Sequence, residues 1–207
     1  INLKVLILAY NNKITDNGIK NLVNLKILNL TRNYKITDNS IKILINLKEL
    51  SLNENITITD NGIKNLVNLK ELYLDENITI TNEGIKNLIN LKILCSFNND
   101  NISDEGVKDL INLEILELIN NYNLTDNGIK NLVNLKELIV TDNITNNGIK
   151  HLINLEKLEI CSDNITYKNG IEFLINLKEL ILYSVYNIYN DIEQLKKIKN
   201  IKLLIFD

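Results

Sequence analysis

The chain has 207 residues, of which 45% are hydrophobic and 24% charged, with a formal net charge of −3. These fractions are typical of a folded globular protein and exclude a disordered chain. The acidic balance argues against a nucleic-acid partner, which requires a basic face. No apolar run reaches about 18 residues and no leader peptide opens the chain, so we expect no membrane partner. Because the chain begins at Ile1 without Met, we expect a fragment of a longer protein.

One motif, Asn-Leu-x-x-Leu-x-Leu, recurs along the whole chain. Its first leucine or isoleucine defines position 1 of each unit and occurs at Leu3, Leu25, Leu47, Leu69, Leu91, Leu113, Leu135, Leu155, Leu177 and Ile201. Neighbouring units are 22 residues apart six times, and the last three spacings are 20, 22 and 24 residues. Nine units and a terminal strand therefore fill residues 1–207 as a single domain.

Each unit predicts a short strand followed by a short helix. Apolar residues recur at positions 1, 4, 6, 12, 17, 20 and 21, which in the third unit are Leu47, Leu50, Leu52, Ile58, Ile63, Leu66 and Val67. Positions 4 and 6 have strand spacing, and positions 17, 20 and 21 have the i, i+3, i+4 spacing of a helix. Burying these side chains stabilises a unit by roughly 10–20 kcal/mol, while ordering costs about 1–2 kcal/mol per residue. The units must therefore stack, pairing their strands and sharing a core.

Polar residues mark the ends of each predicted helix. In the segment from Ile14 to Lys20, Thr15 precedes the helix and is placed to cap it through its hydroxyl. An asparagine follows the helix at position 22 of every unit, where we expect a left-handed turn into the next strand. These residues are Asn24, Asn46, Asn68, Asn90, Asn112, Asn134, Asn154, Asn176 and Asn200.

The segment Leu47-x-x-Leu50-x-Leu52-x-x-Asn55 resembles the leucine-rich-repeat signature, and the resemblance covers the whole chain. It implies an α/β solenoid, arc-shaped, with a parallel β-sheet on the concave side and short α or 3-10 helices on the convex side. It also implies that the asparagine at position 9 is buried and bonds the backbones of adjacent turns as a ladder. The ladder residues are Asn11, Asn33, Asn55, Asn77, Asn99, Asn121 and Asn143, followed by Asp163 and Val185 where the asparagine is replaced.

The segment Ile-Thr-Asp-x-Gly-Ile is similar to the convex half of the cysteine-containing subclass, which occurs in F-box substrate receptors of ubiquitin ligases. Here the ladder residue is Asn rather than Cys, and the unit is shorter than is usual in that subclass.

The sequence gives no support for catalysis, a cofactor or a metal site. The one histidine, His151, falls at position 19 on the predicted solvent side of a helix. No Cys-x-x-Cys or phosphate-binding glycine motif occurs, because the glycines fall once per unit. A catalytic triad would need a well-placed base. We therefore expect a protein that is not an enzyme.

The cysteines and the glycosylation sequons favour a location inside the cell, in the cytoplasm. Cys95 and Cys161 lie at positions 5 and 7, on the outward face of the strands and three units apart. That separation is about 14 Å, too far for a disulfide. Three sequons, at Asn55, Asn77 and Asn143, begin with a ladder residue, where a glycan would disrupt the ladder. The alternative is that these sequons are accidental products of the repeat.

Positions 3, 5, 7 and 8 should form the concave surface, which repeat proteins use to bind partners. This surface is acidic, with Glu49, Glu71, Asp75, Glu76 and Glu117 among its residues. It also carries apolar residues where the repeat predicts exposure: Tyr73, Ile93, Cys95, Phe97, Ile115, Ile119 and Ile139. Exposed apolar patches mark interaction sites, and Tyr73 and Phe97 are typical interface anchors. The alternatives are a solvated charged surface and chance exposure of an abundant isoleucine.

These features predict a scaffold for protein–protein interactions whose partner is basic and apolar. The second reading is a structural module that self-associates end to end, because neither terminal strand carries a polar cap. A third reading is the substrate-recognition arm of a ubiquitin ligase.

Overall fold

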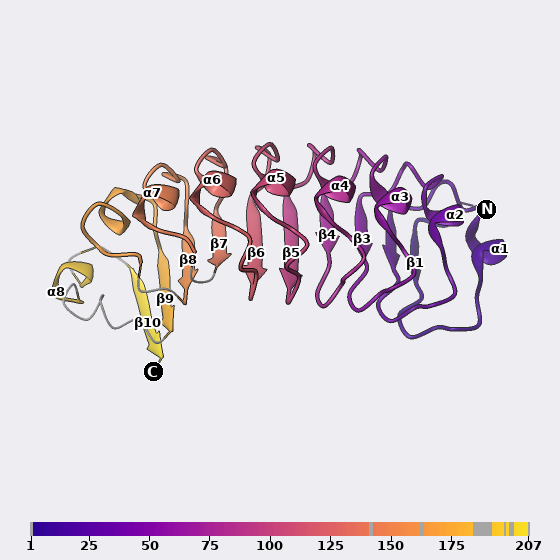
Figure 1. Cartoon of the computed structure of the whole chain (residues 1–207), viewed down its shortest axis with the longest axis horizontal. Helices are drawn as coiled ribbons and strands as arrows, with labels where there is room; N and C mark the ends of the chain where they lie inside the picture. Colours follow the sequence, from indigo (N-terminus) through magenta and orange to yellow (C-terminus); the bar gives the residue numbers. More distant parts are fainter. Residues whose placement is uncertain are drawn as a thin grey trace.

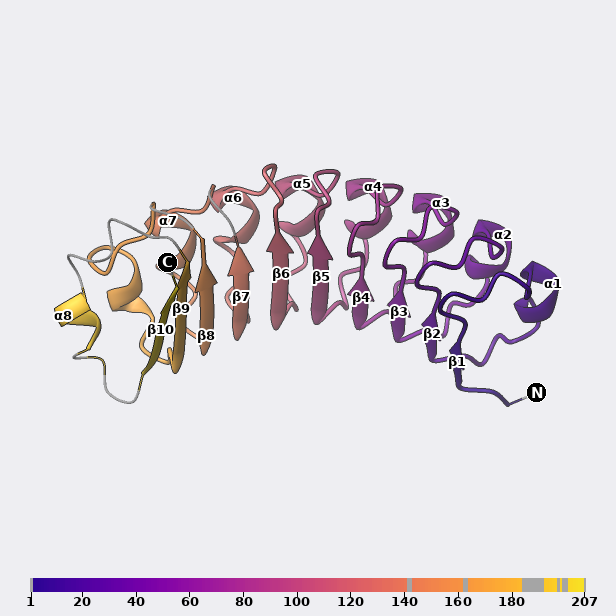
Figure 2. The ribbon, with the colours of Figure 1, turned by 90° about the horizontal axis from the view of Figure 1, so that it is seen from below.

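The computed structural model describes residues 2–140, 143–161, 164–183, 192–196, 198 and 201–206. These residues form an arc in which the helices all lie on one side of a single sheet (Figures 1 and 2). Ten parallel strands pair in sequence order, which confirms the predicted α/β leucine-rich-repeat solenoid. The strands are β1 (Val5–Ile7), β2 (Ile27–Asn29), β3 (Glu49–Ser51), β4 (Glu71–Tyr73), β5 (Ile93–Phe97), β6 (Ile115–Ile119), β7 (Glu137–Val140), β8 (Lys157–Ile160), β9 (Glu179–Tyr183) and β10 (Lys202–Phe206).

Each strand from β1 to β9 is followed by one short helical turn. These turns are α1 (Asp16–Ile19), α2 (Asp38–Ile41), α3 (Asp60–Ile63), α4 (Asn82–Ile85), α5 (Asp104–Val107), α6 (Asp126–Ile129), α7 (Asn146–Ile149), the 3-10 turn η1 (Ile171–Phe173) and α8 (Ile192–Leu195). Each is three or four residues long and is too short to be stable alone. Their stability therefore comes from packing against the sheet and against the neighbouring units.

The register of the sheet pairs equal positions of neighbouring units, as in Glu49 with Glu71 and Leu50 with Leu72. The terminal strand departs from the predicted numbering, because Lys202 rather than Leu203 pairs with Glu179. This shift of one residue turns Leu203 and Ile205 toward the core, against which both pack. The buried face of the strand sets its register, so the terminal unit begins one residue before Ile201.

The core contains six of the seven predicted apolar positions. In the third unit Leu47, Leu50, Leu52, Ile58, Ile63 and Leu66 are all 0% exposed. Position 21 was predicted to be buried and is exposed instead. The helix ends at position 17 and two consecutive turns follow, with Leu66 N donating to Ile63 O and Leu69 N to Leu66 O. Val67 lies in the second turn and points outward, so helical spacing does not apply to it.

The asparagines at position 9 bridge three chain segments. Asn55 is fully buried, and its Nδ2 donates to Leu30 O at 3.1 Å and to Asn33 O at 2.6 Å. Its Oδ1 accepts from Thr57 N and Ile58 N, both at 3.0 Å. Asn33 and Asn77 make the same four kinds of bond. One amide thus satisfies backbone groups of its own turn and of the preceding unit.

The row is irregular at both ends and in the middle. Asn11 is partly exposed and bonds only its own turn, through Lys13 N and Ile14 N. Asn121 is buried and donates to Asn99 O and Ile102 O. Asn99 is also buried, but its Nδ2 has no partner among the described residues. One of the two carbonyls that the pattern offers it, Leu74 O, accepts from Ser96 Oγ.

Asn143 is not a buried ladder residue, contrary to the sequence prediction. It is exposed, and its Nδ2 donates to Tyr122 O. The reason is that its unit has 20 residues. The two missing residues shorten the loop, so Asn143 takes the place that Asn123 occupies one unit earlier, where Asn123 Nδ2 donates to Asp100 O. The replacements Asp163 and Val185 lie outside the described residues.

The described asparagines at position 22, Asn24 to Asn176, do not adopt the predicted left-handed conformation. That conformation occurs at position 8, where the chain leaves the strand, at Tyr10, Arg32, Glu54, Glu76, Asn98 and Asn120, and also at Asn169. Asn200 lies outside the described residues. The position-22 side chains instead form a second amide row. Asn46 Nδ2 donates to Val23 O and Asn68 Nδ2 to Ile45 O, both at 3.0 Å, and the pattern continues to Asn176. Asparagine is favoured there because it occupies a turn and bonds the preceding unit.

A carboxylate links the convex turns of neighbouring units. The Thr59 hydroxyl caps its helix by accepting from Asn61 N at 3.3 Å, as predicted, although Thr15 and Ser103 make no such bond. Thr59 also donates to Asp38 of the preceding unit, through its N at 2.8 Å and its Oγ1 at 2.6 Å. The same bond, from the backbone N of the capping residue to a side-chain oxygen of the preceding unit, recurs along the chain from Asp16 to Asp126. In one unit the acceptor is the amide oxygen of Asn82 instead of a carboxylate.

This carboxylate explains the glycine at position 16. No glycine here has a positive φ, so conformational freedom is not the reason. A Cβ added to Gly62 would lie 2.5 Å from Asp38 Oδ1 and 3.0 Å from Ile58 Cγ2. Ser40 occupies this position in the second unit and donates to Asp16 Oδ1 at 2.6 Å. Burial alone would raise the pKa of Asp16, but hydrogen bonds from Ser40 and Thr37 outweigh it and lower that pKa.

We predict that Asn77→Ala lowers the free energy of unfolding by about 1–3 kcal/mol, because buried backbone groups lose their partners. Urea denaturation measures the change. Asn143→Ala is the matched control and should change stability by less than about 0.5 kcal/mol, since Asn143 is exposed. Equal effects of the two substitutions would contradict the bridging role of the buried amides.

We also predict that Gly62→Ala destabilises the chain by about 1–3 kcal/mol through overpacking against Asp38. Gly62→Ser should cost less, because its hydroxyl can donate to Asp38 as Ser40 donates to Asp16. Gly18→Ala is the comparison: its Cβ would meet Ile14 Cγ2 at 2.8 Å but no carboxylate of a preceding unit, and Ile14 is partly exposed, so we expect a smaller loss. Thermal unfolding of the three variants tests this order, and an equal loss in Gly18→Ala would refute the explanation.

Candidate binding surface on the concave face

Three adjacent strands bring most of the predicted partner-binding residues together. The register aligns Glu71, Ile93 and Ile115 in one row and Tyr73, Cys95 and Glu117 in the next. Phe97 pairs with Ile119 in a third row, and Asp75 precedes them on the chain segment after β4. Glu49 pairs with Glu71 on the side of β3. We call the surface formed by Glu49, Glu71, Tyr73, Asp75, Ile93, Cys95, Phe97, Ile115, Glu117 and Ile119 the central concave surface.

Its apolar side chains are less exposed than the sequence predicted. Tyr73, Ile93, Phe97 and Ile119 are partly buried. Cys95 is only 9% exposed, although it lies on the concave face in register with Tyr73. Strands lie about 4.8 Å apart, so the longer Tyr73 and Glu117 on either side cover the short Cys95 side chain. The sequence gives the face of a residue but not the size of its cross-strand neighbours.

The Cys95 thiol is held in its neutral form. Burial raises the pKa of Cys95 well above its usual range, and the charge of Glu117 and a hydrogen bond to it act in the same direction. The thiolate is the reactive form of cysteine, so Cys95 fills space rather than serving as a nucleophile. Cys161 is exposed, and neither cysteine is part of a disulfide.

Tyr73 is fixed by a hydrogen bond on the same strand. Its hydroxyl donates to Glu71 Oε2 at 2.9 Å. Burial and this bond raise the pKa of Tyr73, which keeps the phenol protonated. The bond holds the carboxylate of Glu71 and the ring of Tyr73 in one arrangement. A partner would therefore meet a preorganised pair rather than two mobile side chains.

The carboxylates of the central concave surface concentrate negative charge. Burial raises the pKa of Glu49, and the charge of Glu71 beside it raises it further. Burial also raises the pKa of Asp75, although Phe97 N at 3.1 Å and Asn53 Nδ2 at 2.9 Å donate to it. Among the described residues, no ion pair neutralises Glu49, Glu71, Asp75 or Glu117. A nearby cation would lower the energy of these charged forms.

Other acidic residues of the concave side are neutralised or displaced. Lys157 pairs with Glu137 and, at 3.9 Å, with Glu159. Lys202 pairs with Glu179 at 2.6 Å. Glu76 is exposed in the left-handed turn after β4 and so lies at the rim rather than on the sheet. Among the described residues of the concave side, the unneutralised charge therefore lies on β3–β6 and the adjoining turn.

Two shallow hollows border the central concave surface. One of about 410 Å³ follows the start of the strands and includes Glu71, Ile93, Ile115 and Glu137 in its lining. The other, of about 300 Å³, is lined mainly by apolar residues, among them Ile119, Ile139 and Tyr183. Both extend beyond the predicted residues toward β7–β9. A partner seated on the predicted patch would reach them.

The remaining chemistry-bearing residues are dispersed. His151 is exposed in the turn after α7. Within the part of the chain that the structure describes, no three His, Cys, Asp or Glu side chains are grouped to hold a metal ion. The helices described there are also all too short and polar to cross a membrane.

Comparisons with known proteins agree on the family. The family model described as Leucine Rich repeat matches residues 1–23. A search of curated proteins finds no match. Internalin C2 of Listeria monocytogenes is 27% identical, with 75% of this chain and 80% of that chain covered and a TM-score of 0.59.

Two further solved structures share the fold at 19% identity. One is the functional domain of InlJ from Listeria monocytogenes, with a TM-score of 0.68, 99% of this chain and 48% of that chain covered. The other is a chain of the octameric complex of latrophilin 3, Unc5D and the leucine-rich repeats of FLRT2, with a TM-score of 0.64 and 99% and 84% covered. The repeat, the parallel sheet and these likenesses together show the leucine-rich-repeat fold, and residues 1–23 match the model of that family.

Proposed function

We propose that the chain is a non-enzymatic scaffold that binds a protein partner on its central concave surface. The observation that carries this proposal is the row of unneutralised carboxylates beside partly exposed apolar side chains on β3–β6. An apolar contact next to a charged field is what a specific protein interface requires. The partner would present a basic and apolar surface.

The comparisons support a protein-interaction role in general terms. Leucine-rich-repeat solenoids offer an extended curved surface for binding, and one neighbour was solved within a complex of several proteins. No cofactor is part of the proposal, because the side chains of the concave surface lack a placed base or a group of metal ligands among the described residues. The overall acidic charge disfavours nucleic acid.

The two energetic contributions of this surface should be separable. Carboxylates steer a basic partner and speed association, whereas buried apolar contact slows dissociation. Because the pKa of Glu49 and that of Asp75 are raised, their charge is lost earlier than that of ordinary carboxyls as the pH falls. The attraction for a basic partner should decrease over the same pH range.

A cytoplasmic location is part of the proposal and depends mainly on the cysteines. Two thiols outside any disulfide suit a reducing compartment. The sequon argument applies only to Asn55 and Asn77, which are buried, because Asn143, the third predicted ladder residue that begins a sequon, is exposed. Absence of a glycan at Asn143 in the native protein would agree with this location.

End-to-end self-association is the alternative that one observation favours. Leu3 and Val5 at the edge of the sheet are 37% and 49% exposed, and the partly exposed Leu6 and Ile14 lie beside the end of the core. A neighbouring unit, from this protein or from a second copy, would cover them. Sedimentation over a range of concentrations separates the two readings, because a scaffold with covered ends stays at one mass. The hypothesis of a ubiquitin-ligase arm is supported only by the similarity of the convex segment Ile-Thr-Asp-x-Gly-Ile to the cysteine-containing subclass.

We predict that Glu49→Gln with Glu71→Gln reduces the association rate of the partner severalfold and weakens its salt dependence. Phe97→Ala should mainly raise the dissociation rate, with a loss of about 2 kcal/mol or more. The partner is first captured from native extract and identified by mass spectrometry, and surface plasmon resonance then measures both rates.

Glu83→Gln with Glu105→Gln is the matched control for the charge change. Both residues are exposed on the convex side, where they pair with Lys86 and Lys108. This control should leave both rates unchanged. If the concave variants bind the purified partner as tightly as the wild type, the binding site is elsewhere.

A further inference from the structure

A row of aliphatic side chains is exposed along the edge of the solenoid where the strands begin. Position 21 is valine or isoleucine in eight consecutive units, and each side chain is between 45% and 79% exposed. The residues are Val23, Ile45, Val67, Ile89, Ile111, Val133, Ile153 and Ile175. Stacking at about 4.8 Å per unit places them in one line. We call this line the aliphatic row.

Composition alone does not explain the aliphatic row. An abundance of isoleucine would scatter it among exposed positions, as at position 10, which holds Asn12, Tyr34, Ile56, Ile78, Asp100 and Tyr122. Position 21 instead holds a β-branched aliphatic residue each time, with valine and isoleucine interchanged. The turn does not need it for packing, because the core is closed by positions 17, 20 and 1. A repeated apolar residue that is left in water suggests a contact surface.

Lysines flank the aliphatic row over its first four units. The segments 18–26, 40–48, 62–70 and 84–92 contain eight lysines and no acidic residue. Lys86 and Lys92 are neutralised by Glu83 and Glu114. The other six have no ion pair among the described residues: Lys20, Lys26, Lys42, Lys48, Lys64 and Lys70.

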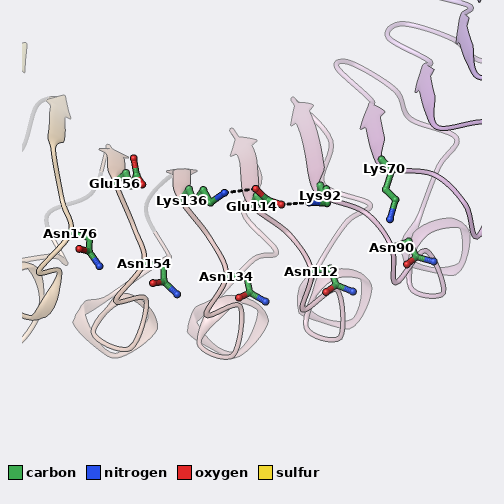
Figure 3. A pocket seen from close by; sticks show the side chains of 10 residues that line it. All are labelled: Lys70, Asn90, Lys92, Asn112, Glu114, Asn134, Lys136, Asn154, Glu156 and Asn176. Carbon is green, nitrogen blue, oxygen red and sulfur yellow. Dashed lines mark hydrogen bonds and ion pairs between the residues drawn. The ribbon is translucent and has the colours of Figure 1, made fainter.

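The lysines at position 2 lie on the same edge as the turns that carry the aliphatic row. Lys26 Nζ donates to Asn46 O, the residue that follows Ile45. Figure 3 shows the continuation of this edge, where Lys70, Lys92 and Lys136 stand opposite Asn90, Asn112 and Asn134. A groove of about 520 Å³ separates the two lines. From the fifth unit on, Glu114 and Glu156 interrupt the lysines and pair with them; Lys136 and Lys92 lower the pKa of Glu114 to about 2.

The chemistry of this edge favours one kind of partner. Protein interfaces are enriched in aromatic residues, methionine and arginine and depleted of lysine, and the four lysine-rich segments contain none of the enriched types. Nucleic acid binding uses aromatic stacking or arginine, which are equally absent there. Aliphatic side chains beside lysines match a bilayer interface, where the former enter the headgroup region and the latter meet anionic lipids.

We propose that the lysine-flanked part of the aliphatic row, in units one to four, is a docking surface for an anionic lipid bilayer. This inference is independent of the concave surface, which has the opposite charge. It departs from the expectation of no membrane partner, which was based on the lack of a spanning segment. Peripheral binding needs only a line of exposed apolar groups and a basic flank. The net charge of −3 does not oppose it, because the two signs lie on different faces.

The test is flotation of the whole chain with vesicles of phosphatidylcholine and phosphatidylserine, and with phosphatidylcholine vesicles alone. The wild type should float only with the anionic vesicles, and less so at high salt. Lys42→Glu with Lys64→Glu should lower the partition coefficient by roughly 25-fold, about fivefold per lysine lost. Ile45→Ser with Val67→Ser should lower it by roughly tenfold.

Matched controls come from the opposite edge of the solenoid. Lys13→Glu with Lys35→Glu changes the same charge, and Ile56→Ser with Ile78→Ser removes two side chains of similar exposure, 57% and 66%. Both controls should float as the wild type does. Equal losses in controls and variants, or no flotation of the wild type, would overturn the proposal. Binding of soluble poly-glutamate without flotation would also overturn it and would identify an acidic protein site instead.

Discussion

Side-chain bridges between neighbouring units are the interaction on which the rest of the structure depends. A unit of 22 residues has a three- to five-residue strand and a helical turn, so most of its backbone lies in turns whose own hydrogen bonds pair only part of their N–H and C=O groups. Buried backbone groups without partners are costly. Asn55, Asp38 and Asn68 supply those partners by reaching into an adjacent unit. With a repeat of 22 residues, all three side chains reach their partners in the adjacent unit.

The bridges explain features that appear unrelated in the sequence. Gly62 is required by the carboxylate of Asp38 rather than by its own φ. Asn143 is exposed because its unit lacks the two residues that would bring it to the ladder. At Asn99 the buried Nδ2 has no partner among the described residues, and Ser96 Oγ occupies Leu74 O, one of the two carbonyls of the pattern. Each departure follows from geometry between units, since no unit determines its own contacts.

A fixed scaffold leaves the outward positions free to carry function. Positions 3, 5 and 7 form an acidic and apolar surface around Tyr73 and Phe97, while positions 2, 18 and 21 form a basic edge with an aliphatic row. The two surfaces have opposite charge and different apolar residues. They match the two different partners that we propose, a basic protein on the concave side and an anionic bilayer at the edge. One chain could bind both together.

The sequence predicted the features that follow from the 22-residue period. It did not predict the burial of side chains that depends on contacts between units. Period alone placed Leu50 and Ile58 in the core and aligned Tyr73 with Cys95. Burial of Cys95 depends on the size of Tyr73 and Glu117, which lie on other strands. The helical spacing suggested that Val67 is buried, but the helix ends four residues earlier and a turn exposes it. The role of Asn68 is to donate to Ile45 O, a carbonyl in the turn of the preceding unit. The need of such turn carbonyls for a donor could have pointed to the asparagine that recurs at position 22.

Native-state hydrogen exchange tests the account most directly. The amides of Ile58, Thr59, Ile80 and Thr81 lie outside the sheet and donate to side-chain oxygens of the ladder and of the preceding unit. If the bridges hold the units together, these amides exchange only through global unfolding, as slowly as the strand amides of β3 and β4. Fast exchange at these amides, with protection limited to the strands, would show that the sheet alone holds the solenoid together and would contradict the account.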